Sequence, residues 1–416
     1  MKFKQKKFGR IFFYFLVFLA ALFVLAVLTR ELGRRLSGFI IASDQPARTI
    51  ETSQPVVADI FFSNEPDTNG VKLSSADFLK LITTEIDQAK KTLEIAVYSV
   101  KSASIKEAIY RAARRGVKVT LILDFRKAAI HNQFFYDLPP EIKRLDLGSD
   151  SLSLNDVTLM HHKFAIIDRG AANEKLIFGS FNWTELQAVY DRSYILVTAN
   201  HELVASFGRE FERLVRGEGE KNKLANVNYH PWDLNMKTGA YAYEVWFGPG
   251  WTENGFNKRI SDLLKEAKSN IKIMIWDFTD SSLAKEILSR ARAGLKVTIL
   301  ADNFNFYSTS SVFQLLNKIK AEEKLTTLEI LNDVAFSPPA YSTRTINGDA
   351  ELDPFLHYHV LIIDDKKILF GTNNWSRGGS YSNDEAVMVS DDPKIISRFL
   401  DSFSYNYQIN KNYVSR

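Results

Sequence analysis

The feature that most constrains the fold is an internal duplication. Residues 91–124 have the pattern of a strand, a helix and a second strand, and the helix ends at Gly116. Residues 270–302 repeat this order, with Gly294 ending the helix 178 residues after Gly116. Two copies at this spacing predict two fused domains rather than an array of small repeats. Strand–helix–strand units with long apolar strands predict crossover connections and a largely parallel sheet covered by helices.

Glycine, proline and asparagine mark the boundaries of the two copies. They cluster over 218–241, which is typical of a linker, and a polar stretch containing proline covers 36–55. The predicted order is an N-terminal segment, a linker, a first α/β lobe, a second linker and a second α/β lobe. These parts cover residues 1–35, 36–55, 56–217, 218–241 and 242–410. The duplication makes a monomer sufficient for a two-lobed site, without excluding oligomers.

An unbroken apolar run occupies residues 11–28. Its length, at about 1.5 Å rise per residue, nearly crosses a hydrocarbon core of about 30 Å. Four lysines and Arg10 precede the run, which favours an N-terminus held in the cytoplasm. We therefore predict a single-pass membrane anchor, with the catalytic part on the periplasmic or extracellular side. A cleaved signal peptide is the alternative, but the run is long for one and no small-x-small cleavage site follows it.

Composition excludes several kinds of site. The chain has no cysteine, which rules out disulfides, thiolate catalysis and cysteine metal ligands. The net charge of +4 comes from residues 1–40, which carry eight basic residues and one acidic residue. The rest of the chain carries 45 basic and 48 acidic side chains, a net of −3. This balance gives no general electrostatic basis for binding nucleic acid, which is a less favoured partner than a phospholipid membrane.

Each copy contains one histidine motif. The motifs are His161, Lys163 and Asp168 in the first copy, and His357, His359 and Asp364 in the second. On a strand, the first and third residues of each motif share a face, whereas the middle residues, His162 and Tyr358, point to the other face. The motif therefore presents a nucleophile or base beside a cation, with a second histidine in the place of the cation in the second copy.

A glycine-containing segment follows each histidine motif. Its polar residues are Ser180 and Asn182 in the first copy and Thr372 and Asn374 in the second. Glycine allows close approach of the backbone, and hydroxyl, amide and helix N-terminal donors suit an anion such as phosphate. The histidine pair suggests that one attacks phosphorus, while the other protonates the leaving oxygen and then activates water. Lysine and backbone donors can stabilise the charge, so this chemistry requires no metal and no cofactor.

With these paired motifs the chain resembles the phospholipase D superfamily, which carries two His-x-Lys-x4-Asp motifs and paired Gly-Ser-x-Asn segments. The resemblance covers roughly residues 56–410. It implies two tandem α/β lobes, each with a mostly parallel or mixed sheet flanked by helices, and a site at their pseudo-twofold interface. It also implies metal-independent hydrolysis or exchange of a phosphodiester through phosphohistidine. Its catalytic positions are His161, Lys163, Asp168, His357, His359 and Asp364, and its phosphate-binding positions are Ser180, Asn182, Thr372 and Asn374.

The second motif departs from the superfamily pattern. His359 stands where lysine is expected, and an imidazole with an unperturbed pKa of about 6.5 need not be charged at neutral pH. Thr372 replaces the usual serine but keeps the hydroxyl. Because the first motif is complete, we expect His161 to be the nucleophile and His357 the general acid and base.

The superfamily often carries Asn-x-Glu some twelve residues after the glycine. Residues 383–385 fit this pattern, but residues 191–193 read Asp-Arg-Ser, so the glutamate is missing from the first copy. Glu385 and Asp191 are therefore candidate orienting carboxylates, and the sequence does not decide which histidine each serves. Asp168 and Asp364 have an alternative reading as structural carboxylates at strand ends.

The favoured function is that of a membrane-anchored phosphodiesterase acting on phospholipids, by hydrolysis to phosphatidate or by exchange with an alcohol. A nuclease on the same scaffold is an alternative, and it requires a basic groove beside the site. A cardiolipin synthase-like transferase is another. The non-enzymatic alternative is a degenerate phosphate- or lipid-binding protein, which His359 and the missing glutamate favour.

Overall fold

The computed structural model describes residues 48–52, 56–66, 70, 72–124, 138–148, 158–219, 231–250, 255–334 and 355–414. All of these residues belong to one compact unit. The predicted membrane anchor at 11–28 lies outside them. Among the residues that the structure describes, no helix is long and apolar enough to cross a membrane.

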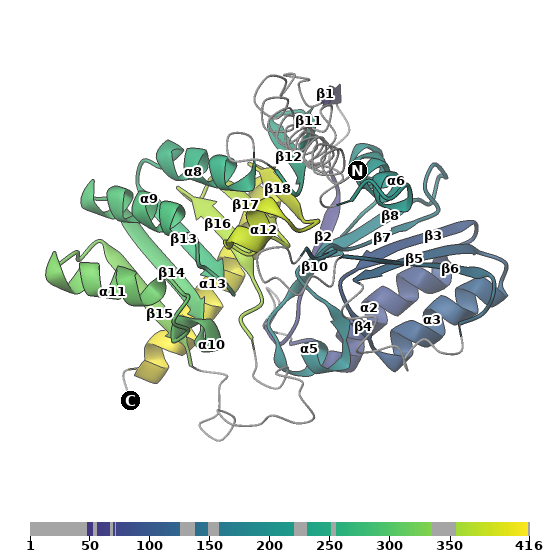
Figure 1. Cartoon of the computed structure of the whole chain (residues 1–416), viewed down its shortest axis with the longest axis horizontal. Coiled ribbons are helices and arrows are strands. Elements are labelled where there is room, and N and C mark those ends of the chain that lie inside the picture. Colours follow the sequence, from purple (N-terminus) through teal and green to yellow (C-terminus); the bar gives the residue numbers. More distant parts are fainter. Residues whose placement is uncertain are drawn as a thin grey trace, which may run out of the picture. The chain divides into compact units, whose positions relative to one another are not determined.

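The first lobe is built on a seven-stranded sheet with the order β2-β10-β8-β7-β3-β5-β6. Its strands are β2 (Ala58–Phe62), β3 (Thr92–Val97), β5 (Lys118–Asp124), β6 (Ile142–Leu147), β7 (Lys163–Ile167), β8 (Lys175–Gly179) and β10 (Tyr194–Thr198). Its helices are α2 (Ser75–Gln88), α3 (Ala103–Arg114), α5 (Glu185–Tyr190) and α6 (His201–Val215). The short strands β4 (Val100–Lys101) and β9 (Trp183–Thr184) pair beside it. Helices α2 and α3 lie side by side against the sheet (Figure 1).

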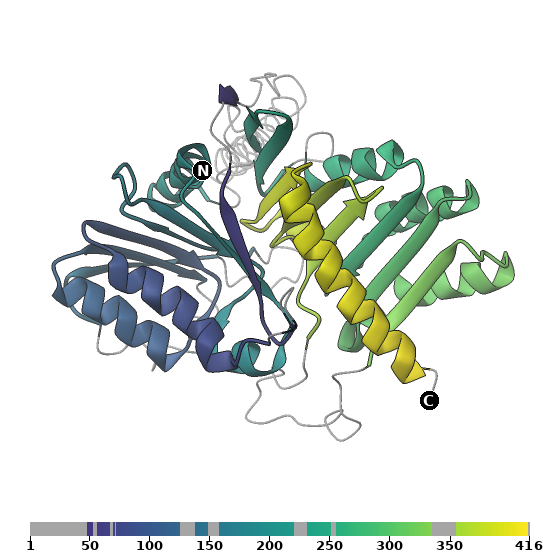
Figure 2. The same ribbon diagram turned by 180° about the vertical axis from the view of Figure 1, so that it is seen from behind.

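The second lobe is built on a nine-stranded sheet with the order β1-β11-β12-β18-β17-β16-β13-β14-β15. Its strands are β1 (Arg48–Thr52), β11 (Trp232–Thr238), β12 (Tyr241–Phe247), β13 (Asn270–Ile275), β14 (Lys296–Asp302), β15 (Leu328–Asp333), β16 (His359–Ile363), β17 (Lys367–Gly371) and β18 (Ala386–Ser390). Its helices are α8 (Phe256–Glu266), α9 (Ser281–Arg292), α10 (Asn303–Phe306), α11 (Phe313–Glu322), α12 (Arg377–Tyr381) and α13 (Pro393–Val414). The long helix α13 runs across this sheet (Figure 2).

The two sheets repeat one topology, which confirms the predicted duplication. In each lobe three parallel strands (β3, β5 and β6; β13, β14 and β15) are followed by antiparallel strands that carry the motifs (β7, β8 and β10; β16, β17 and β18). Both sheets are therefore mixed, which is one of the two arrangements that the resemblance implied, whereas the largely parallel sheet expected from the strand–helix–strand units is wrong. Among the motif strands, β7 and β8 are joined by a short turn, as are β16 and β17, and such a turn forces antiparallel pairing. The longer connections to β10 and β18 contain α5 and α12.

The predicted linkers contain paired strands. Strand β1 lies within 36–55 and strand β11 within 218–241, and they pair with each other in parallel. In β11, Leu234 and Met236 are fully buried, whereas the alternating positions between them are more exposed. This period of two is the signature of a half-buried strand, which the nearby glycine and proline residues obscured in the sequence.

Three apolar cores hold this arrangement together. One packs around α2 and α3 in the first lobe, and a second packs around α8 and α9 in the second lobe. The third contains residues of both lobes. In it, the rings of Tyr194 and Tyr358 stack with their centroids 5.9 Å apart, and the Tyr194 hydroxyl donates to the carbonyl of Gly371 at 3.1 Å. The lobes are therefore packed as one body, so their facing motif strands have a defined geometry.

Candidate active site

The main chains of the two histidine motifs are each bonded to the opposite lobe. The amide of His161 donates to the carbonyl of Asp384 at 2.9 Å, and the amide of His357 donates to the carbonyl of Arg192 at 2.9 Å. In return, the amides of Asp384 and Arg192 donate to carbonyls just before each histidine. The two copies thus clamp each other reciprocally, which places the predicted Asn-x-Glu segment and its counterpart beside the histidine of the other lobe.

The side chain of His161 is oriented by Glu385. Its Nδ1 lies 2.9 Å from both carboxylate oxygens, and both residues are buried. The hydroxyl of Thr372 donates to this carboxylate at 2.5 Å, and the Asn383 amide donates to it at 3.2 Å. A carboxylate on Nδ1 assigns the proton to that nitrogen and leaves the Nε2 lone pair for chemistry. The structure therefore assigns Glu385 to His161, a pairing that the sequence left open.

Lys163 supplies the cation beside His161. Its ammonium is almost fully buried, donates to the carbonyl of His161 at 2.9 Å, and lies 5.4 Å from the ring centroid of Tyr98. Burial lowers the pKa of Lys163 to about 7, although the charges of Glu385 and Asp124 oppose this. Burial likewise raises the pKa of Glu385 to about 8, against the charge of Lys163. The charge of Lys163 and that of Glu385 therefore influence each other's ionisation.

The half of the site around His357 has a different chemistry. Burial lowers the pKa of His357 well below its ordinary value, the charges of Lys163 and His161 lower it further, and a backbone hydrogen bond with Ser180 opposes them. The pKa of His359 is lowered in the same direction, first by burial and then by His357, His161 and Lys163. The charges of His161 and Lys163 act on both histidines of the second lobe, so the two motifs lie close together. Burial thus disfavours the charged form of both imidazoles in the second lobe.

Ser193 occupies the place in the first lobe that Glu385 occupies in the second. Each lies thirteen residues after the hydroxyl residue of its Gly-Ser or Gly-Thr segment. The Ser193 hydroxyl, the Nδ1 of His357 and both ring nitrogens of His359 are buried and make no hydrogen bond to any residue that the structure describes. His357 is instead flanked by aromatic rings, with centroids 5.5 Å away at Trp276 and 5.4 Å away at His359. The second histidine thus lacks the carboxylate that orients the first.

The residues predicted to bind phosphate divide into two kinds. The hydroxyl of Ser180 accepts from the amide of Tyr194 at 3.2 Å, and that of Thr372 donates to Glu385, so both hold the frame of the site. Asn182 and Asn374 are less than 10% exposed, and their side-chain oxygens find no partner among the described residues. An amide oxygen cannot donate to phosphate, so the side-chain nitrogens of Asn182 and Asn374 remain the candidates for contacting it.

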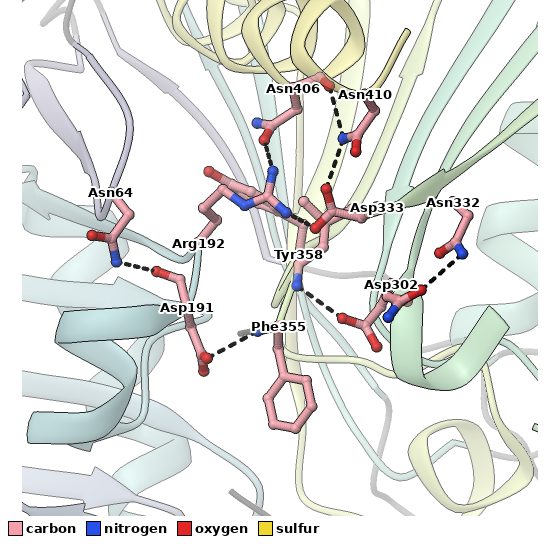
Figure 3. A network of polar contacts seen from close by, with 12 residues as sticks. Asn64, Asp191, Arg192, Asp302, Asn332, Asp333, Phe355, Tyr358, Asn406 and Asn410 are labelled. Atoms are coloured by element: carbon pink, nitrogen blue, oxygen red, sulfur yellow. Dashed lines mark hydrogen bonds and ion pairs between the residues drawn. The ribbon is translucent and has the colours of Figure 1, made fainter. Parts of the chain in front are cut away.

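Asp191 does not orient a histidine ring in this structure. Its carboxylate accepts from the amide of Phe355 at 3.0 Å, two residues before His357 (Figure 3). The counterpart, Asn383, accepts from the amide of Leu159 at 3.1 Å. The prediction of Asp191 as an orienting carboxylate is therefore corrected, because it holds the main chain that leads to the histidine. An amide oxygen in the other lobe makes the same contact, so a negative charge is not required for it.

Four residues that frame the site were not predicted to do so. Tyr98 and Trp276 lie at equivalent positions after β3 and β13, and their rings contact His161 and His357 edge-on. The aspartates that end β5 and β14 accept from amides of the residues just before each histidine; these are Asp124 with Met160 and Asp302 with Leu356. The sequence signal that could have identified these four residues is that each pair occupies equivalent positions in the two repeats.

The last residues of the motifs, Asp168 and Asp364, lie at the far ends of β7 and β16 from the histidines. Asp168 accepts from three consecutive amides of residues 90–92, and Asp364 accepts from those of residues 268–270. Both have positive φ, at 48° and 54°. Assigning them to the chemistry is therefore wrong, and their structural reading holds. They tie the turn after each motif strand to the start of the neighbouring strand.

We expect Asp168→Ala to destabilise the fold without altering the site. The substitution removes the acceptor of three backbone amides and of the Asn173 amide. A hydrogen bond to a charged group contributes about 1.5–3 kcal/mol net, and water can replace part of this where it reaches the freed amides. The expected loss in the free energy of unfolding is about 2–4 kcal/mol, measured by urea titration. Unchanged stability, or a lost kcat in a fully folded variant, would return Asp168 to the catalytic group.

Comparisons with known proteins agree with this geometry. The family model described as "cardiolipin synthase, PLD-like domain" matches residues 82–215 and 260–407. A mitochondrial cardiolipin hydrolase of Chlamydomonas reinhardtii is 29% identical over 130 residues, covering 31% of this chain and 53% of that protein. A phospholipase D of Rickettsia felis is 29% identical over 128 residues, covering 31% of this chain and 59% of that protein. The chain thus spans little more than half the length of these relatives.

Solved structures share the two-lobed fold. The crystal structure of phosphatidylserine synthase from Haemophilus influenzae Rd KW20 matches with a TM-score of 0.59 at 15% identity, over 86% of this chain and 88% of that chain. Polyphosphate kinase from Porphyromonas gingivalis matches with a TM-score of 0.51 at 12% identity, over 84% of this chain and 50% of that chain. At these identities the likeness concerns the fold alone. The family model, however, covers well over half of the sequence, and the chain belongs to the phospholipase D superfamily.

Proposed function

We propose that the protein is a metal-independent phosphodiesterase of the phospholipase D type, which cleaves phospholipids through a phosphohistidine on His161. The observation that carries the proposal is the asymmetry of the site. His161 has an orienting carboxylate and a buried lysine, whereas burial favours the neutral form of His357 and its Nδ1 has no hydrogen-bond partner among the described residues. These are the properties of a nucleophile and of a separate proton carrier.

In the first step, Nε2 of His161 forms a bond to phosphorus and the bond from phosphorus to the headgroup oxygen breaks. Glu385 holds the Nδ1 proton and stabilises the positive charge that develops on the imidazole. Lys163 and the two asparagines are placed to stabilise the phosphoryl oxygens. The leaving oxygen takes a proton from His357. The anionic phosphodiester raises the pKa of His357 when it binds, and this makes protonation of that imidazole available at neutral pH.

In the second step, His357 accepts a proton from water while the water oxygen bonds to phosphorus. The bond from phosphorus to Nε2 breaks, and its electron pair returns to His161. Phosphatidate leaves, and His357 is again protonated for the next headgroup. An alcohol that takes the place of water gives headgroup exchange by the same transfers.

Two facts support a phospholipid as the substrate. The relatives are named for cardiolipin and phospholipid hydrolysis. Beyond residue 40 the chain has a net charge of −3, which does not favour a polyanion such as DNA. We propose that the apolar run at 11–28 holds the site at a bilayer on the periplasmic or extracellular side. A monomer suffices, because the duplication supplies both halves of the site.

The test is a substrate panel with the full chain in detergent or liposomes, containing a chelator. Vesicles of phosphatidylcholine, phosphatidylglycerol and cardiolipin are run beside single- and double-stranded DNA, each with and without added glycerol. We expect phosphatidate from vesicles, measured by mass spectrometry, and phosphatidylglycerol from the glycerol arm with phosphatidylcholine if exchange competes with water. Cleavage of DNA with intact lipid would replace the proposal with a nuclease. Folded protein that cleaves neither would mean a binding protein without turnover.

The alkaline side of the pH profile is expected to report Lys163. Burial lowers its pKa to about 7, so the free enzyme loses the ammonium as the pH rises through that value. We therefore expect kcat/KM to fall above about pH 7, and kcat to fall at a higher pH because the bound anion restores the lysine pKa. In Lys163→Arg, which stays charged, the fall in kcat/KM is expected to disappear, even if its plateau is about tenfold lower owing to the different geometry of the guanidinium. An unchanged alkaline fall in this variant would assign it to a group other than Lys163.

A further inference from the structure

His357 lacks a carboxylate on its ring, so its orientation has to come from somewhere else. In the other half, Glu385 contacts His161 directly, but Ser193 stands at the corresponding position opposite His357. The Nδ1 of His357 makes no hydrogen bond to the described part of the chain. A general acid has to be held within a few tenths of an ångström of its target. The main chain that carries His357 is therefore the place to look for its support.

Four consecutive residues around His357 are held by polar groups that gather at one buried cluster (Figure 3). The amides of Phe355, Leu356 and His357 donate at 3.0, 2.9 and 2.9 Å, and the Tyr358 hydroxyl donates at 2.7 Å. Their acceptors are, in the same order, the carboxylates of Asp191 and Asp302, the carbonyl of Arg192 and the carboxylate of Glu65. Every residue of this stretch thus has a hydrogen-bond partner, and one of these partners is the carbonyl of Arg192.

Arg192 joins the two lobes through its side chain. It comes from the first lobe, just before β10, and is 1% exposed. Its guanidinium makes an ion pair with Asp333 at the end of β15 and a hydrogen bond with Asn406 in α13 (Figure 3). Asn406 also donates to Glu65 at 2.7 Å, so the arginine and Tyr358 share one anchoring network. Burial raises the pKa of Glu65 and of Asp302, while the charge of Arg192 lowers both.

The other half of the site shows what is special about this cluster. There Asp384 takes the place of Arg192 and makes the same main-chain contacts to the His161 strand. Its carboxylate lies within 4.8 Å of ligand atoms of His162 and Glu210, which is a cluster with a different balance of charge. His161 has this main-chain clamp and the Glu385 contact as well. His357 has the main-chain contacts but no carboxylate on its ring. The orientation of His357 therefore depends more on its main-chain contacts than that of His161 does.

We infer that Arg192 is a positioning residue for His357, acting through the main chain of 355–358 in place of a carboxylate on the ring. The inference rests on the proposed role of His357 as the proton carrier. It predicts that disturbing Arg192 slows the steps in which His357 moves a proton, and leaves the attack by His161 on phosphorus intact. These are protonation of the leaving alcohol and activation of water.

The experiment compares a phospholipid with a p-nitrophenyl phosphodiester, whose leaving group departs without a proton. In Arg192→Met we expect phospholipid turnover to fall on the order of 10–100-fold. With the nitrophenyl ester, rapid-mixing kinetics are expected to show a burst of nitrophenolate close to one per enzyme at the wild-type rate. Slow turnover follows, because the phosphohistidine accumulates when water is poorly activated. Acid-labile phosphate on the protein measures that intermediate directly.

The control is Arg259→Met, which removes a partly buried arginine of α8 that pairs with Glu244 and Glu266, and it is expected to keep wild-type kinetics. Arg192→Lys is expected to retain part of the turnover that Arg192→Met loses. Lysine keeps the positive charge but lacks the planar guanidinium that contacts both Asp333 and Asn406. If Arg192→Met does not fold, Asn406→Ala takes its place, since it removes the hydrogen bond to Arg192, together with those to Glu65 and Ser402, and leaves the ion pair with Asp333.

A burst rate that falls in proportion to turnover would overturn the inference, because the defect would then include the attack by His161 or the fold as a whole. Unchanged turnover in folded Arg192→Met would overturn it as well. Failure of the proposed function gives a different result, since the wild-type protein itself would then cleave neither substrate.

Discussion

His161→Ala is expected to lower kcat/KM for phosphodiester cleavage by at least about 10⁴-fold, because the substitution removes the atom that bonds to phosphorus. His161 is the histidine with the complete set of partners. Glu385 holds its Nδ1 at 2.9 Å, and the buried ammonium of Lys163 is bonded to its own carbonyl. No other imidazole in the described residues has both a carboxylate and a lysine at the site, so none replaces it.

The measurement is phosphatidate release together with acid-labile phosphate on the protein after a rapid quench. His161→Ala is expected to show neither, and its unfolding curve is expected to stay close to wild type because the ring lies at the site rather than in an apolar core. His201→Ala is the matched control, since that histidine is largely exposed at the start of α6 and pairs with Glu174. Labelled phosphoprotein in His161→Ala that disappears in His357→Ala would reverse the two roles.

Glu385→Gln is expected to lower kcat by roughly 10²- to 10⁴-fold while substrate binding changes little. Glutamine has nearly the size of glutamate, so the shape of the site is largely preserved, although its single oxygen can replace only one of the two oxygens that accept from Thr372 and Asn383. It cannot stabilise the positive charge that His161 acquires as the bond to phosphorus forms. The effect therefore lies in the transition state, and it should appear in kcat rather than in KM.

The check is a full kinetic profile of Glu385→Gln beside Glu212→Gln. Glu212 is a half-exposed carboxylate in a surface ion pair with Arg169, and such a pair contributes about 1 kcal/mol or less. The surface variant is expected to match wild type. Full activity in folded Glu385→Gln would mean that the contact with His161 is structural, and the nucleophile would then need a different source of orientation.

The sequence determined the elements that depend on local pattern and repetition. The two strand–helix–strand units, the glycine at each helix end and the paired motifs were all readable, because side-chain period and glycine conformation are local properties. The same logic placed His161 beside Lys163 and His357 beside His359 on one face of a strand. It also identified Ser193 as the residue that replaces glutamate in the first copy, because the spacing from Gly179 and Gly371 is shared.

Sheet direction was the property that local pattern misjudged. Long apolar strands such as β5 and β14 predicted parallel sheets, but the motif strands that follow them run antiparallel to one another. The strands β1 and β11 were missed for a related reason. A strand of five to seven residues flanked by glycine and proline resembles a linker until a partner strand pairs with it.

Only the tertiary structure decided how the two halves of the site are connected. Glu385 serves the histidine 224 residues before it, and Asp191 serves the main chain before His357 instead of a ring. Asp168 and Asp364, predicted to take part in the chemistry, instead accept hydrogen bonds from the backbone at the far ends of their strands. Arg192, an unremarkable residue in the sequence, became the link between the lobes. Such contacts depend on the packing of one lobe against the other, and the free energy of that packing comes from residues spread over the whole chain, so no local pattern encodes it.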